Sequence, residues 1–551
     1  MTSQAAESDA LLITHRHANY SNISTLASPD NLTRSDVAVN SSSKIDTGDV
    51  DKSYFSWSKL WKYTGPGRTS FLTPYRLHGA KSIISDFLWT SLNYDTNIYF
   101  FVRSIAYLDP GNLESDLQSG ALAGYKLLWL LLWAHVAGTL GLIIQIMASR
   151  LGVVTGQHLA QLIRHNYRRE VSFILWAFTQ LAIIGSDMQE IVGTAIAFKI
   201  LFGLKLWIGV IITGFDTLSF IFIQGARKLE IGFMVLIGVM AACFWIEMIK
   251  SKPDWGQIVD GIVIPRVPSN AVVQAVGMLG CVIMPHNMYL HSALVMTRDL
   301  GTRATNKLKE ANFYFAIESG LALTTSYLIN LAIVVVFAKV FYSPDMPADT
   351  PLPGLYDAAT VLVKTLGESS KYFWAFGLLA AGQSSTFAST LAGQYVMDGF
   401  FGAVFRKQWH RIVVNRSIAL VPSLLVAVLA VDRFDTMGEF LNVVQCICLP
   451  TAVIPILKLN ASASIMQTEF RSSKWLSFVC WTLSLIIIGF NILIFHTFLN
   501  EMELQSPIVG YIIGGAYLAF LGYLTITPLR AHHHEKDSPD TEWEEGSIGT
   551  P

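Results

Sequence analysis

The chain has 551 residues, of which 52% are hydrophobic and only 14% are charged, whereas soluble domains carry roughly 25% charged residues. A soluble chain of this length could not bury that much apolar surface, so the composition indicates a polytopic membrane protein and leaves no large ectodomain for a single-span receptor. Lys and Arg (39) nearly balance Asp and Glu (40), which excludes a basic nucleic-acid-binding surface. Five scattered cysteines predict no disulfide framework.

Residues 1–67 are expected to be a cytosolic tail and the approach to the first helix. Residues 1–53 are polar, rich in Ser, Asn and Asp, and lack the apolar core of a signal peptide, so disorder is expected. Within them, Glu7, Leu11 and Leu12 match the pattern of an acidic dileucine sorting signal of endosomes, lysosomes and vacuoles. Such a signal would bind a clathrin adaptor; the alternative is a chance match in a low-complexity tail.

Apolar stretches that could cross a bilayer, which takes about 20 residues, follow along the rest of the chain. We expect spans at 95–124, 127–149, 171–203, 206–224, 231–248, 271–296, 311–341, 373–402, 412–431, 438–457, 475–499 and 508–527. Lys and Arg are more frequent in the loops after even-numbered spans, which predicts that these loops and both tails are cytosolic. The second tail comprises residues 528–551.

Two spans carry helix-breaking motifs near their centres. The first span contains Asp-Pro-Gly-Asn at 109–112, and the sixth contains Met-Pro-His-Asn at 284–287. Proline removes a backbone donor, and irregular backbone at membrane depth survives only where protein or a water-filled cavity satisfies it. Matching interruptions in the two halves of a transporter indicate its binding site. An inverted repeat of spans 1–5 and 6–10 follows as a hypothesis.

The side chains at the two breaks favour a transition-metal ion. Asp109 is a carboxylate in mid-membrane, where such a group is costly and functional by default. Asn112 adds an amide oxygen, Met284 adds a thioether, and unwound carbonyls of Ala106 and Cys281 could complete the set. Oxygen and sulfur donors together suit first-row transition metals, whereas Ca²⁺ and Mg²⁺ take oxygen alone. Alternatively, Met284 is an ordinary core side chain.

Other ionisable groups within the spans suggest a route for protons. His286 and His291 flank the second break, and histidine changes charge at mildly acidic pH. Asp187 and Glu190 are three residues apart, so both carboxylates lie on one helix face. Two apposed carboxylates tend to separate in acidity, which favours a proton relay. The alternative is a structural pair satisfied by Ser, Thr or Arg.

Later spans carry further polar residues, two of which have alternative interpretations. Arg416, near the start of the ninth span, is either a counter-charge on the proton route or a positively charged interfacial anchor. Gln445, on the tenth span, either orients the metal and water or only bridges helices. Asp216, Glu318 and Asp398 are expected to be structural or to line a vestibule.

These motifs resemble the signatures of the natural resistance-associated macrophage protein family. The matching stretches are SIAYLDPGNLESDLQSG at 104–120, MPHNMYLHS at 284–292, GSDMQE at 185–190 and GQSST at 382–386. The last two fit the branch of eukaryotic divalent metal transporters. The resemblance covers roughly residues 104–527.

The resemblance implies an all-α, LeuT-like fold with broken helices 1 and 6, comprising a ten-helix core at 104–457 and two more helices at 458–527. It implies proton-coupled symport of Fe²⁺, Mn²⁺ and related ions into the cytosol, with no permanently bound cofactor, in an endosomal, lysosomal, vacuolar or plasma membrane. The family's metal ligands fall on Asp109, Asn112, Met284, Ala106, Cys281 and Gln445. Its proton-route residues fall on Asp109, His286, Asp187, Glu190 and, by best match, Arg416.

One stretch departs from the family pattern. Residues 68–103 separate Gly-Pro-Gly at 65–67 from Ser104, where the family joins the two almost directly. The stretch looks inserted, and Arg103 would lie within two turns of Asp109 and repel a dication. The chain could therefore be a metal-binding sensor or a transport-defective variant.

Three other functions fit the same residues less well. A symporter for another solute, such as an amino acid, is disfavoured because Asp109 would repel a carboxylate. A magnesium carrier is disfavoured because its site should lack the Met284 thioether. A membrane enzyme is disfavoured because no span carries HExxH or GxSxG and no cofactor motif is present.

Overall fold

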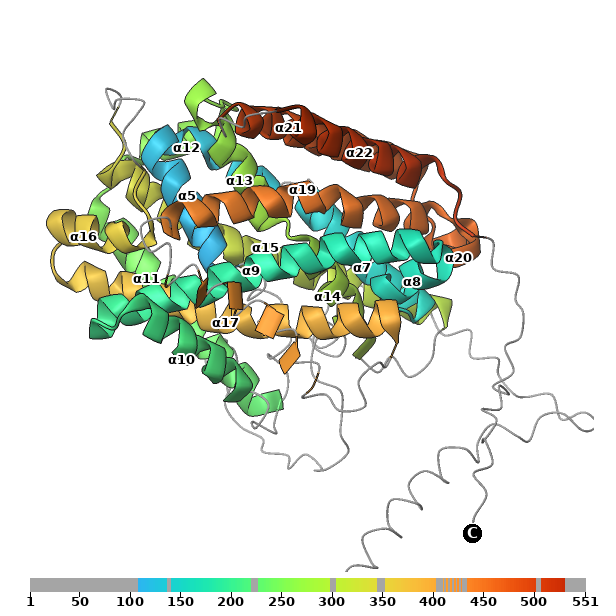
Figure 1. The fold of residues 1–551 in the computed structure, drawn as a ribbon, viewed down its shortest axis with the longest axis horizontal. Coiled ribbons are helices and arrows are strands. Elements are labelled where there is room, and N and C mark those ends of the chain that lie inside the picture. Colours follow the sequence, from blue (N-terminus) through green and yellow to red (C-terminus); the bar gives the residue numbers. More distant parts are fainter. Residues whose placement is uncertain are drawn as a thin grey trace, which may run out of the picture. The chain divides into compact units, whose positions relative to one another are not determined.

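A computed structural model describes residues 108–135, 140–219, 226–297, 304–343, 352–402, 434–501 and 507–530, with isolated positions between 410 and 428 (Figure 1). Several sequence predictions lie outside these residues. They are the sorting signal at Glu7, Leu11 and Leu12, the 68–103 segment, the Ala106 carbonyl and Arg416.

Every regular element in the described ranges is a helix. The first half of the chain forms α5 (Pro110–Ala123), α6 (Leu128–His135), α7 (Leu140–Thr155), α8 (Leu159–Asn166), α9 (Arg169–Phe202), α10 (Leu206–Ser219), α11 (Ala226–Ser251) and α12 (Trp255–Val263). The second half forms α13 (Val272–Val282), α14 (Pro285–Leu294), α15 (Thr305–Val340), α16 (Leu355–Leu366), α17 (Ser369–Phe401), α19 (Phe434–Ala461), α20 (Ala463–Phe470), α21 (Lys474–Glu501) and α22 (Pro507–Ile526). Short 3-10 turns occupy Gly124–Leu127, Ser269–Ala271 and Val295–Thr297.

Six segments of the described chain are long and apolar enough to cross a membrane. They are Arg169–Phe202, Ser269–Leu294, Thr305–Val340, Phe440–Ala461, Lys474–His496 and Ile508–Ile526. Each coincides with a span predicted from the sequence. Gly141–Thr155 and Leu206–Phe215 are shorter apolar helices that fall at two further predicted spans.

The helices differ sharply in how much of their surface is covered by protein. In the most apolar part of the segment containing α13 and α14, 83% of the residues are buried, and the same share holds for α19. The corresponding shares are 28% for α21 and 11% for α22. Figure 1 shows α21 and α22 running together beside α19. Exposed apolar side chains on these last two helices are what a lipid-facing surface requires.

The central helices pack around α9 and α19. Helix α9 packs against α17, α10 and α19, while α13 packs against α19 and α5. Helix α15 covers α5 and α7. This packing places the N-terminal end of α5, which follows Asp109, among helices from both halves of the chain.

Both predicted breaks coincide with helix starts in which proline is the first helical residue. Helix α5 starts at Pro110 after Asp109 in extended conformation (φ −114°, ψ 165°). Helix α13 ends at Val282, Ile283 leaves helical geometry, and α14 starts at Pro285 after an extended Met284 (φ −69°, ψ 131°). Proline is favoured at this position because its missing N–H would be unsatisfied there anyway. The predicted break in the sixth span is therefore confirmed.

Candidate metal site

Asp109 is a buried carboxylate that caps α5. Only 1% of the residue is exposed. Its Oδ1 atom accepts a hydrogen bond of 3.0 Å from the Asn112 backbone N–H and another from the Asn112 side-chain amide. Its Oδ2 atom has no hydrogen-bond partner among the described residues. A buried carboxylate oxygen without a donor is costly, and a bound cation would remove that cost.

Met284 holds the equivalent position at the second break, and its side chain does not cap the helix. The residue is 2% exposed, and no hydrogen bond to its side chain caps α14. The start of α14 therefore relies on Pro285 and on the extended Met284 backbone, with no capping hydrogen bond to the Met284 side chain. The thioether remains available for another purpose.

Proline also explains why Cys281 offers a backbone oxygen. In a continuous helix its carbonyl would accept from the N–H four residues on, but residue 285 is proline and has none. The Cys281 side chain is fully buried and bonds locally, Sγ to the Met278 carbonyl at 3.3 Å. Ala106 stands four residues before Pro110 in the same way, although it lies outside the described residues.

A chain of amides joins the start of α5 to α9 and α19. Asn442 donates to the Gly111 carbonyl (3.2 Å), Gln189 donates to Asn442 Oδ1 (2.8 Å), and Gln445 donates to Gln189 Oε1 (2.8 Å). Gln445 is fully buried, and its Oε1 has no hydrogen-bond partner among the described residues. The predicted Gln445 thus reaches α5 only through two residues that the sequence did not single out. Gln189 lies inside the GSDMQE motif, which was the available signal.

Close packing holds this end of α5 in place. A Cβ atom at Gly111 would lie 2.5 Å from Gln189 Oε1. A Cβ atom at Gly193 of α9 would overlap the ring of Pro110. Gly193 therefore requires glycine, because the Pro110 ring cannot move aside, whereas a side chain at position 111 would force the Gln189 amide to shift.

Asp116 is a further buried carboxylate on α5 that the sequence did not single out. It is fully buried, and neither of its carboxyl oxygens has a hydrogen-bond partner among the described residues. It lies within electrostatic range of Asp109, two helical turns away. The second carboxylate makes this part of the protein more favourable for a cation.

The predicted carboxylate pair on α9 is joined by one serine. The Ser389 hydroxyl of α17 lies 2.5 Å from Asp187 Oδ1 and 2.8 Å from Glu190 Oε2, so its single hydrogen can be donated to either carboxylate, and Ser186 donates to Glu190 Oε1 (3.0 Å). The expectation that Asp187 and Glu190 share one face is confirmed. The hydroxyl partners also match the structural alternative, so a proton-relay role stays a prediction.

The two histidines of α14 lie in different surroundings. His286 is 2% exposed, and its Nδ1 has no hydrogen-bond partner in the described part of the chain. His291 is also buried, but its Nε2 lies 3.3 Å from Ser319 Oγ of α15. His286 therefore lies in the first turn of α14, next to the break, whereas His291 contacts the neighbouring helix α15.

The site would hold a metal with mixed donors. Within the described residues, no three His, Cys, Asp or Glu side chains gather closely enough to hold a metal ion. The candidate set instead combines the Asp109 carboxylate, the Asn112 amide, the Met284 thioether and freed backbone carbonyls. Such a donor set favours a transition metal over Ca²⁺ or Mg²⁺.

Known proteins are similar to this chain both in sequence and in fold. The profile of the family "Nramp: Natural resistance-associated macrophage protein-like" matches residues 100–497. The chain is 43% identical over 459 residues to "Metal transporter nramp1 homolog" of Dictyostelium discoideum, covering 82% of this chain and 78% of that protein. It is 42% identical over 484 residues to "Metal transporter Nramp3.2" of Populus trichocarpa, covering 85% and 87%.

Solved structures agree with the sequence comparison. A histidine-to-alanine variant of the Eremococcus coleocola manganese transporter superposes with a TM-score of 0.69 at 27% identity, covering 80% of this chain and 94% of that one. The predicted all-α, LeuT-like membrane fold is thereby confirmed, as is the expectation of a transporter and not an enzyme. The family match and the relatives above 40% identity establish that this chain is a member of the Nramp family.

Proposed function

We propose that this chain carries divalent transition-metal ions, Mn²⁺ and Fe²⁺ among them, into the cytosol by proton-coupled symport with alternating access. One observation carries the proposal. The buried Asp109 carboxylate has an oxygen without a donor, at a helix start whose counterpart presents the Met284 thioether. The relatives named above are metal transporters, and the solved structure is a manganese transporter, which supports the same conclusion.

The metal would bind between the two breaks. Asp109 supplies the negative charge, Asn112 and the freed carbonyls supply neutral oxygens, and Met284 supplies the soft donor that disfavours Ca²⁺ and Mg²⁺. Because α14 starts at Pro285 after the extended Met284, α13 can pivot there without breaking a continuous ladder of hydrogen bonds, and Pro110 gives the start of α5 the same property. That pivot would open the site to the cytosol.

Protons would enter through Asp109 or His286 and leave along α9. Asp187 and Glu190 share Ser389 as a donor, so a proton arriving on either carboxylate changes the hydrogen bonding of both. His291 and Arg416 remain proposed members of the route. Asp187→Asn and Glu190→Gln should reduce proton flux more than metal affinity, and equal loss of both properties would contradict the relay.

The decisive experiment is Mn²⁺ uptake into proteoliposomes that hold the full chain. With an acidic exterior we expect uptake, with collapse of uptake at neutral pH and in Asp109→Ala. Isothermal titration with Mn²⁺ on the same preparations separates binding from transport. Binding without uptake would instead support the sensor, and absence of both would contradict the metal site itself.

A shortened chain should test residues 68–103. The protein lacking these residues is compared with the full chain in the same assay. Uptake by both means that the segment is tolerated. Uptake by the shortened chain alone means that the full chain is transport-defective.

We further propose that both termini are cytosolic and that Leu11 and Leu12 direct sorting to an endosomal, lysosomal or vacuolar membrane through a clathrin adaptor. The basis is the loop charge pattern and the acidic dileucine pattern of the sequence. Replacing Leu11 and Leu12 with alanine should move a fluorescent fusion to the cell surface. An unchanged distribution would contradict the signal.

A further inference from the structure

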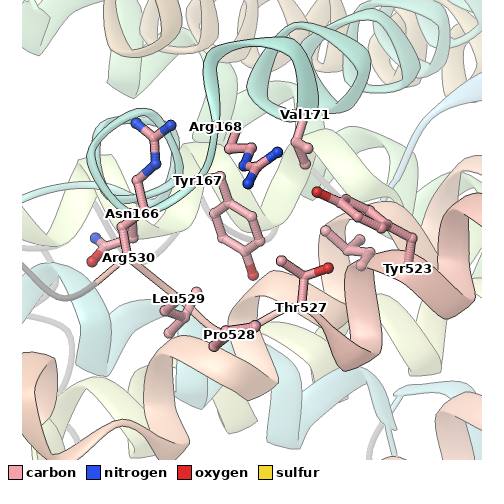
Figure 2. Close-up of a pocket in the computed structure, with 10 residues that line it drawn as sticks. Asn166, Tyr167, Arg168, Val171, Tyr523, Thr527, Pro528, Leu529 and Arg530 are labelled. Atoms are coloured by element: carbon pink, nitrogen blue, oxygen red, sulfur yellow. The ribbon is translucent and has the colours of Figure 1, made fainter.

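A pocket of about 340 Å³ lies where α8 passes into α9 and the chain leaves α22 (Figure 2). Small-molecule sites have volumes of roughly 300–1,000 Å³, so this one has room for a small polar group. Arg168 and Arg530 are its charged lining residues, and no acidic side chain belongs to the described lining. The pocket is therefore suited to an anion.

Tyr167 contributes a buried hydroxyl to this pocket. The residue is 6% exposed, yet its hydroxyl has no hydrogen-bond partner among the described residues. Figure 2 shows the hydroxyl pointing toward Thr527, with the Arg168 guanidinium between the Tyr167 and Tyr523 rings. Burial raises the pKa of the Tyr167 phenol, so the group stays protonated and can donate. A buried donor without an acceptor indicates a missing ligand.

Lys458 of α19 removes the main electrostatic obstacle to an anion at this position. The C-terminal end of a helix carries partial negative charge, and α22 ends beside the pocket. Lys458 Nζ donates to the carbonyls of Leu524 (2.6 Å) and Thr527, and it lies 5.7 Å from the centre of the Tyr167 ring. The last turn of α22 is thus neutralised.

The helices beside the pocket expose apolar side chains. Ile526 is 83% exposed at the end of α22, and Phe173 is 55% exposed in the first turns of α9. Both helices are predicted to cross the membrane, so these side chains meet lipid tails near the bilayer surface. Polar and cationic groups in the pocket thus lie next to apolar surface outside it.

We propose that this pocket binds the phosphate of an anionic phospholipid headgroup from the leaflet predicted to be cytosolic. The Arg168 guanidinium pairs with the phosphate and the Tyr167 hydroxyl donates to it, while Arg530, which extends away from the Tyr167 hydroxyl in Figure 2, turns toward the pocket to add a second pair. The acyl chains then lie along the exposed faces of α22 and α9. An arginine and a hydroxyl together are a common donor set for phosphate.

The test is a titration of the purified full chain with a short-chain phosphatidylinositol phosphate, against phosphatidylcholine of the same chain length. The double variant Arg168→Gln/Arg530→Gln should bind at least roughly tenfold more weakly, because hydrogen bonds to charged groups contribute about 1.5–3 kcal/mol each. Tyr167→Phe keeps the packing and should weaken binding by several-fold. Arg471→Gln removes an exposed arginine elsewhere and should change nothing.

Two outcomes would overturn the proposal. One is equal binding of the anionic lipid by the double variant and the unaltered chain. The other is that inorganic phosphate or soluble inositol phosphate binds as tightly as the lipid and that lipid in nanodiscs does not displace it. That result would mean that the pocket takes a free phosphate and not a lipid headgroup. Mn²⁺ uptake measured on the same variants keeps this result separate from the metal site, because none of these residues belongs to it.

Discussion

The two helix starts at the centre of the protein use one backbone device with two different side chains. Both α5 and α14 start with proline after an extended residue. At the first, the Asp109 carboxylate also caps the helix by accepting from Asn112. At the second, Met284 makes no capping hydrogen bond. Asp109 therefore has a structural role beside its proposed role as ligand, whereas Met284 has no such capping role.

This difference predicts that the two positions fail in different ways. Truncating Asp109 to alanine should affect both helix stability and metal binding, because the cap and the charge are lost together. A volume-conserving change at Met284 should affect only which metal is chosen. The following experiments separate these effects, starting with the largest.

Asp109→Asn should abolish Mn²⁺ uptake without unfolding the protein. Asn caps helices as well as Asp does, so only the charge is lost. Metal affinity should fall by more than the roughly 10–100-fold caused by losing a residue that merely supports a ligand. Asp109→Ala should lose uptake and, in addition, about 1 kcal/mol of stability from the missing cap. If Asp109→Asn retains uptake, the Asp109 carboxylate is not a metal ligand.

Met284→Leu should keep the fold and change metal preference. The swap conserves volume, which costs less than about 1.5 kcal/mol in a core. Competition assays should show Ca²⁺ inhibiting Mn²⁺ uptake about tenfold more strongly, because the soft donor is gone. If Ca²⁺ exclusion is unchanged, Met284 is core packing and not a ligand.

Gly111→Ala should loosen the first helix start from its neighbours. The added methyl group meets the Gln189 side chain, which also holds Asn442 and Gln445. Overpacking of this kind costs about 1–3 kcal/mol, visible as a lower Tm. Gly185→Ala is the matched control, since its Cβ would lie 3.7 Å from Leu441, an ordinary contact. Equal Tm values for the two variants would show that Gln189 yields easily.

Acid should loosen the contact between α8 and the C-terminal end of α14, the helix that follows the second break. Leu159 of α8 donates its backbone N–H to Ser292 of α14 (2.9 Å), and burial lowers the pKa of the adjacent His158 to about 4. Because unfolded histidine titrates near 6.5, stability from neutral His158 is lost as pH falls from about 6.5 toward 4. Between pH 7 and pH 5 the loss should be about 2 kcal/mol. His158→Gln should show a shallower fall of Tm with pH, and an equal slope would contradict the assignment.

The sequence predicted the elements of this fold well where proline and long apolar runs decide the structure. Pro110 and Pro285 determined where α5 and α14 start, and the span expected at 171–203 is α9 at Arg169–Phe202. The candidate site could also be proposed from the sequence, because a carboxylate such as Asp109 is rare at membrane depth and Asn112 and Met284 stand beside the two proline breaks; its role as a metal site stays a prediction.

What the sequence could not supply is contact between distant helices. Nothing in it pairs Ser389 with Asp187 and Glu190, nor Asn442 with Gly111, since these partners are separated by about two hundred residues or more. Asp116 stands within the 104–120 motif, yet its residue type alone did not mark it. Its significance rests on burial without a partner among the described residues, which only packing reveals.

The contact between Gly193 and Pro110 bears on inherited variation. Every missense change at codon 193 adds at least a Cβ atom, and each would collide with the proline that starts α5. Any amino-acid replacement at this position should therefore displace the start of α5, however conservative its chemistry. Replacement should be tolerated better at Gly515 of α22, where an added Cβ meets nothing within 4 Å among the described atoms.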